Sequence, residues 1–208
     1  MADVASAPVV AGLSLGIALA SAPGPVQAVL LGEAIRGGVA RGLKALAGAT
    51  STFALLLLGL ALGLSVATPS GTVLRVLKVV GGVLLIWLAW EGFRSRNEPL
   101  EASRMRRQLP PVARGSLAIV LNPGAWLFLG AVASPLIATA TKAGGRTGAL
   151  LTAAALLLGA GLGDLAVVLL GGMGIRRARD RIRLWIRTGL AFVLAGLGVW
   201  LVLQGAIS

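Results

Sequence analysis

The chain has 208 residues, of which 57% are apolar and only 12% are charged, and its formal net charge is +12. Ordinary soluble domains are about 45–50% apolar and about 25% charged, so this composition excludes the common soluble classes. The chain contains no cysteine and no histidine, which excludes disulfides, thiol nucleophiles and metal sites built from those residues.

The apolar residues form six long blocks, and each block predicts a helix that crosses a bilayer. A bilayer core about 30 Å thick needs about 20 apolar residues as helix. In chain order, the expected spans cover residues 9–31, 46–67, 76–89, 116–139, 148–171 and 188–203. The third is short, and it becomes long enough if Arg75, Lys78 and Arg94 extend their charged ends to the two surfaces. We therefore expect an all-α membrane protein of about six transmembrane helices.

The basic residues lie between these spans, which indicates topology signals and contact with anionic lipids, and not nucleic-acid binding. Fifteen Lys and Arg residues follow the first, third and fifth spans, whereas four follow the second and fourth. Cytoplasmic loops of membrane proteins carry the excess of Lys and Arg. The pattern predicts a protein of the cytoplasmic membrane, with the loops after helices 1, 3 and 5 inside and both termini outside.

Two interruptions occur in matching places. Pro23-Gly24-Pro25 lies inside the first span, and Asn122-Pro123-Gly124 lies inside the fourth. Proline removes a backbone donor and clashes with the preceding turn, so each motif should break its helix and free polar backbone groups at membrane depth. Breaks in corresponding helices are typical of transporters built from inverted repeats, where they mark the substrate site.

This spacing predicts one transmembrane domain, residues 1–208, made of two inverted three-helix repeats with helices one and four broken. The repeats would cover about residues 9–94 and 115–206, joined by a cytoplasmic loop at residues 95–113. Small residues at helix spacing, Gly12 with Gly16, Gly59 with Gly63 and Gly159 with Gly163, also predict close packing between helices.

Several motifs in order along the chain resemble the lysine exporter (LysE/RhtB) family of amino-acid export proteins. They are Pro23-Gly24-Pro25, the glycines Gly38, Gly42 and Gly48, Leu77-Lys78 with Gly81, Asn122-Pro123, and Pro135. The resemblance covers roughly residues 12–205. It implies a small inner-membrane exporter of amino acids driven by the proton gradient, which forms oligomers such as homodimers. The chain departs from the family pattern at Val26 and Gln27, at Thr52-Phe53 and at Gly124, where the family often carries other, mostly polar, residues.

Asp164 lies in the middle of the fifth span, where a charged side chain costs about 2.5–3.5 kcal/mol on insertion scales. Such an acid is a candidate proton carrier, and the alternative is a structural acid bonded to a neighbouring helix. Gln27 follows the first break, so it either contacts the substrate or satisfies a carbonyl that the prolines free. For Glu33, a surface ion pair with Arg36 at helix spacing is preferred over a role in a gate.

The residues favour a secondary active transporter that exports amino acids or similar small solutes by alternating access. The substrate-binding and gating candidates are Pro23, Gly24, Pro25, Gln27, Asn122, Pro123 and Gly124, and Asp164 is the proton-coupling candidate. Expected partners are the solute and membrane lipids, with no cofactor and no enzymatic activity. The alternative is a passive channel or a metal-ion exporter. A lipid-modifying enzyme ranks last, since no catalytic set of polar groups is recognisable.

Overall fold

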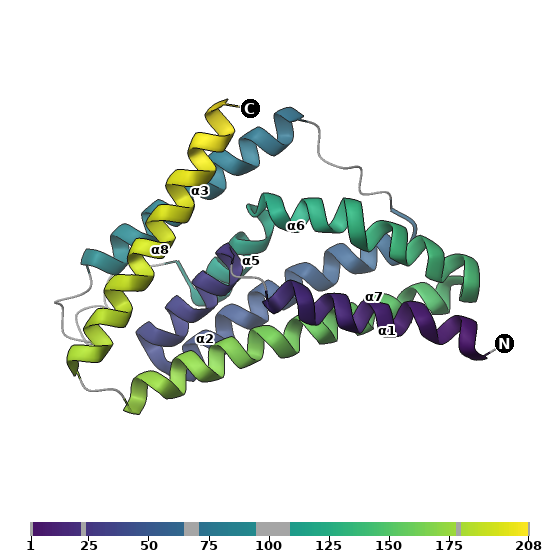
Figure 1. Cartoon of the computed structure of the whole chain (residues 1–208), viewed down its shortest axis with the longest axis horizontal. Helices are drawn as coiled ribbons and strands as arrows, with labels where there is room; N and C mark the ends of the chain where they lie inside the picture. Colours follow the sequence, from purple (N-terminus) through teal and green to yellow (C-terminus); the bar gives the residue numbers. More distant parts are fainter. Residues whose placement is uncertain (1, 22–23, 65–70, 95–108, 178–179, 208) are drawn as a thin grey trace.

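The described residues of the computed structural model are 2–21, 24–64, 71–94, 109–177 and 180–207, and they are almost entirely helical (Figure 1). The elements in chain order are α1 (Ala2–Ser21), α2 (Pro25–Ala61), α3 (Gly71–Arg94), α5 (Pro111–Val120), α6 (Pro123–Phe128), the π-helix η1 (Leu129–Ala133), α7 (Ser134–Arg177) and α8 (Asp180–Ile207). The expected all-α fold class is therefore confirmed for this part of the chain.

Two helical stretches are long and apolar enough to cross a membrane among the residues that the structure describes. They are Pro25–Ala61, with a mean hydropathy of 1.6, and Pro123–Met173, with 2.2. Large apolar side chains also point outward, with Leu55 70% and Leu170 71% exposed. Water would disfavour so much exposed apolar surface, whereas a lipid environment accommodates it.

The first two expected spans do not form two separate helices. The first span, residues 9–31, is divided between α1 and α2, and α2 then continues through the second span to Ala61. A kink at Gly37 and Gly38 separates the two parts of α2, with Gly38 at φ 76°. Glycine adopts this left-handed region without the steric cost of a Cβ atom, so the chain turns there without a loop.

The fourth expected span is also divided. α5 ends at Val120, α6 starts at Pro123, and a helical segment then runs through η1 into α7. α7 is kinked at Gly144 (φ −137°, ψ 18°) and Gly145 (φ 60°, ψ −154°), close to the torsions of Gly37 (φ −134°, ψ 16°) and Gly38 (φ 76°, ψ −176°). α5 begins at Pro111, so the expected loop at residues 95–113 is shorter at its C-terminal end than predicted.

The helices pack in a crossed arrangement, in which helices of the first half of the chain lie against helices of the second half (Figure 1). α1 lies along α7, α5 lies along α2, α2 also packs against α7, and α3 pairs with α8. Glycine allows the close approaches. A Cβ added at Gly12 would lie 2.8 Å from the carbonyl oxygen of Thr152, and one at Gly163 would lie 2.5 Å from the Cβ of Ala20.

The close packing predicted for the glycines of α1 and α7 is confirmed. Within the part of the chain that the structure describes, the prediction is wrong for Gly59 and Gly63. Among the described residues, a Cβ at Gly59 would meet only Leu64, five residues along the same segment, at 3.4 Å. Gly63 has a φ of 92°, and a Cβ there would meet none of the described atoms within 4 Å, so it serves the turn after α2.

Candidate functional site

A cavity of about 210 Å³ lies where the two interruptions meet. Gly24, Pro25 and Gln27 line it from the first interruption, and Asn122 and Gly124 line it from the second. The remaining lining residues are Leu19, Ala20, Val26, Ala49, Thr50, Phe53, Ile119, Ala125, Leu157, Ala160, Gly161 and Asp164. The fold thus brings together residues from α1, α2, α5, α6 and α7.

The first interruption is formed by the end of α1 and the start of α2. Gly24 precedes α2 in an extended conformation, and its carbonyl accepts a 3.0 Å hydrogen bond from the amide of Ala28. Pro25 occupies the first helical position, where the missing N–H costs nothing because amides there have no partner within the helix. The N-terminus of α2, which is the positive end of the helix dipole, therefore faces the cavity. Pro23 lies outside the described residues.

The second interruption is held by two side chains that satisfy its backbone. Asn122 caps α6, and its Oδ1 accepts a 3.0 Å hydrogen bond from the amide of Gly124. The indole Nε1 of Trp126 donates to the carbonyl of Val120 at 2.8 Å. Pro123 is buried at the start of α6 but is not among the lining residues. Asn122 thus both lines the cavity and stabilises the break.

Asp164 is the only charged side chain among the described residues that line the cavity. Its Oδ1 accepts a 3.2 Å hydrogen bond from Nε2 of Gln27, across 137 positions of sequence. The same amide group lies 3.5 Å from the carbonyl oxygen of Ala20, at the end of α1. Gln27 therefore bonds a carbonyl next to the break, as one of the two interpretations expected, and it also lines the cavity.

The sequence-based interpretation of Glu33 is wrong. Glu33 is not at the surface, since it is only 2% exposed, and its carboxylate pairs with Arg114 and Arg41. Arg114 is one of the basic residues that follow the third expected span, but it is only 2% exposed and lies within α5. The sequence feature that could have indicated the burial of Arg114 is its position inside the apolar stretch Pro111–Val120.

Comparison with known families identifies the chain. The family model for LysE type translocators matches residues 17–205, which include every residue that lines the cavity. The chain belongs to the LysE type translocator family. This family is one of membrane transporters, so a LysE translocator moves a small solute and works in a lipid environment. No curated protein and no solved structure matches this LysE chain.

Proposed function

We propose that this LysE translocator exports amino acids or closely related small solutes across the cytoplasmic membrane, and that the cavity between the two interruptions is its substrate site. The observation that carries the proposal is the convergence of Gln27, Asn122 and Asp164, from three distant segments, on one cavity. Transporter sites form where the ends of interrupted helices meet inside the bilayer.

The lining chemistry suits a small solute with an ammonium group. The carboxylate of Asp164 attracts a cation, and the amide of Gln27 holds that carboxylate in place at 3.2 Å. The N-terminal end of α2 offers amide donors and a positive dipole end to a carboxylate group. The volume of about 210 Å³ is below the roughly 300–1,000 Å³ of sites for drug-sized ligands. Because the walls of the cavity are mostly apolar, they favour a solute that carries a compact apolar side chain.

Two inverted halves would move this site between the two sides of the membrane. The matching torsions at Gly37–Gly38 and Gly144–Gly145 support an internal repeat. The crossed packing supports it too, because the helix before each interruption packs on the long helix of the other half, α1 on α7 and α5 on α2. Six crossings with both termini outside would place the basic residues that follow the first, third and fifth expected spans on the cytoplasmic side.

Asp164 is the proposed coupling residue. An acid within the apolar span of α7 that faces a cavity can exchange protons with water there. When a proton neutralises the carboxylate, the solute's ammonium group loses its partner and leaves. Return of the proton to the cytoplasmic side then restores the charged site for the next solute.

The test is efflux from cells loaded with a labelled amino-acid mixture, with and without an uncoupler. Wild type, Asp164→Asn and an empty vector are compared, and Thr52→Ala is the matched control because its hydroxyl bonds back to Gly48 at 2.9 Å and does not line the cavity. We expect export in wild type and Thr52→Ala, and loss of export with Asp164→Asn or with the uncoupler.

Three other results of the efflux assay would contradict parts of this proposal. Flux that persists with the uncoupler and only follows the solute's own gradient would instead indicate a passive channel. No difference between wild type and the empty vector would refute amino acids as the solute. Full export by Asp164→Asn would refute its role in coupling.

A further inference from the structure

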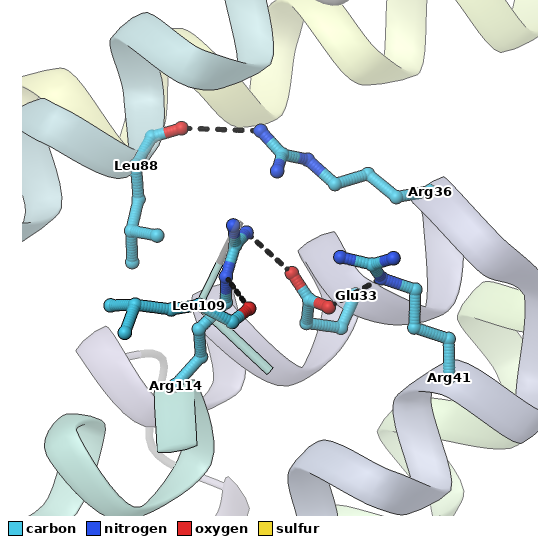
Figure 2. A network of polar contacts seen from close by, with 6 residues as sticks. All are labelled: Glu33, Arg36, Arg41, Leu88, Leu109 and Arg114. Atoms are coloured by element: carbon cyan, nitrogen blue, oxygen red, sulfur yellow. Dashed lines mark hydrogen bonds and ion pairs between the residues drawn. The ribbon is translucent and has the colours of Figure 1, made fainter. Parts of the chain in front are cut away.

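A buried network of charges lies beside the cavity and outside its lining. Glu33 accepts a 2.8 Å hydrogen bond from Nη1 of Arg114 on one carboxylate oxygen and a 2.6 Å hydrogen bond from Nε of Arg41 on the other. Figure 2 shows the two guanidinium groups approaching Glu33 from opposite sides. The side chains of Glu33 and Arg114 are 3% and 2% exposed, and that of Arg41 is 28% exposed.

The network joins several elements of the fold. Glu33 lies in α2 before the kink at Gly37–Gly38, and Arg41 lies after it, so their ion pair spans the kink. Arg114 lies in α5, donates to the carbonyl of Leu109 at 3.1 Å and stands 5.7 Å from the ring centre of Trp87 in α3. Arg36 adds a 3.4 Å hydrogen bond to the carbonyl of Leu88 in α3 (Figure 2).

α2 and α5 pack against each other from the cavity to the network, which lies at the far end of this interface. Ile119 and Ala49 line the cavity, and the close approach of Gly115 to Ala45 lies about one turn further from it. The hydroxyl of Ser116 also donates to the carbonyl of Gly48 at 3.2 Å.

Arg114 lies five residues before Ile119 in α5, a rise of about 7.5 Å, and Glu33 lies six residues after Gln27 in α2, a rise of about 9 Å. Their ion pair therefore joins the two helices one to two turns from the cavity.

The two halves differ at this place. Glu33 lies four residues before the double glycine Gly37–Gly38, whereas Ala140 lies four residues before Gly144–Gly145. The first half thus carries an acid where the second half carries a small apolar residue. Arg36 and Arg41 follow the first expected span and Arg114 follows the third, and both of these segments carry the excess of basic residues that predicts a cytoplasmic position.

We propose that Glu33, Arg114 and Arg41 form the gate that closes the cavity toward the cytoplasm. This proposal rests on the proposed function, since it assigns one step of alternating access to these residues. Desolvation offsets much of the attraction within a buried ion pair, so such a pair is better suited to selecting one arrangement than to adding stability. Separation of Arg114 from Glu33, with bending at Gly37–Gly38, opens the cavity to solute from the cytoplasm.

The chain has no cysteine, so a single introduced cysteine reports access to the cavity. Gly161 is suitable because it lines the cavity and a Cβ added there meets no atom of the described residues within 4 Å. The full-length Gly161→Cys protein is labelled in membrane vesicles of both orientations with a maleimide that cannot cross the bilayer. Lys44→Cys, at an exposed position, marks which vesicles present the face that carries the gate.

The gate is tested with Glu33→Gln and with the double variant Glu33→Gln plus Arg114→Met, which removes both members of the buried ion pair. Lys44→Gln is the control, since it removes a charge from the same segment outside the network. We expect labelling from the Lys44 side to rise about tenfold or more in both gate variants, because tenfold corresponds to about 1.4 kcal/mol of the closed state's stability. Labelling from the other side should not rise.

An unchanged rate in a folded double variant, or an equal rise with Lys44→Gln, would overturn the gate. A double variant that does not fold would assign the network to stability alone and would overturn the gate as well. Labelling needs no solute, so a failed efflux assay with a positive labelling result would refute the proposed substrate and leave the gate standing.

Discussion

Replacement of Gly115 by alanine tests the packing that forms one wall of the cavity. A Cβ at this position would collide with the carbonyl oxygen of Ala45 and would lie 3.0 Å from the amide nitrogen of Ala49, both of which are backbone atoms of α2. Backbone atoms cannot rotate away as a side chain can, so α2 and α5 must separate. Overpacking of this kind costs about 1–3 kcal/mol, which corresponds to a fall of about 2–12 °C in Tm for a chain of this size.

Thermal unfolding of the purified protein in detergent measures this effect, with Gly196→Ala as the matched control. Gly196 is an exposed position in α8, and a Cβ there meets no atom within 4 Å in the part of the chain that the structure describes. Alanine at such a site should raise stability by about 0.4–1 kcal/mol, because it restricts the unfolded chain. The two variants should therefore shift Tm in opposite directions. An unchanged or raised Tm for Gly115→Ala would refute the close approach of α2 and α5.

Two further predictions concern the buried ion pair and the second interruption. Glu33→Gln should lower the free energy of unfolding by about 3–5 kcal/mol because it removes the carboxylate that pairs with the buried charge of Arg114, and adding Arg114→Met should recover most of that loss. Equal Tm values for the single and double variants would contradict this reasoning. Asn122→Ala removes the oxygen that accepts from the amide of Gly124, so it should cost about 1 kcal/mol and abolish export. Thr139→Ala, whose hydroxyl bonds back within its own helix, should keep both stability and export; full export by Asn122→Ala would remove that residue from the site.

The positions of the helix interruptions were predictable from local chemistry. Pro25 and Pro123 each stand at the first residue of a helix, because proline has no amide to donate and its ring restricts the residue before it. The continuation of α2 through the double glycine was not predicted. Gly37 and Gly38 turn the helix without ending it, and glycine permits that conformation without requiring it, so the sequence did not distinguish a kink from a loop.

Sequence by itself determined the membrane class, the two interruptions and the candidacy of Asp164, because block length, proline chemistry and the cost of a charge in an apolar span are local properties. Only the tertiary structure decided the partners. Gln27 meets Asp164 across 137 positions, and Glu33 meets Arg114 across 81 positions. Which side chains meet depends on how each helix is rotated and where it crosses its neighbour. Those quantities are set by packing over the whole fold, so an acid that resembles a surface residue at helix spacing is in fact buried between two arginines.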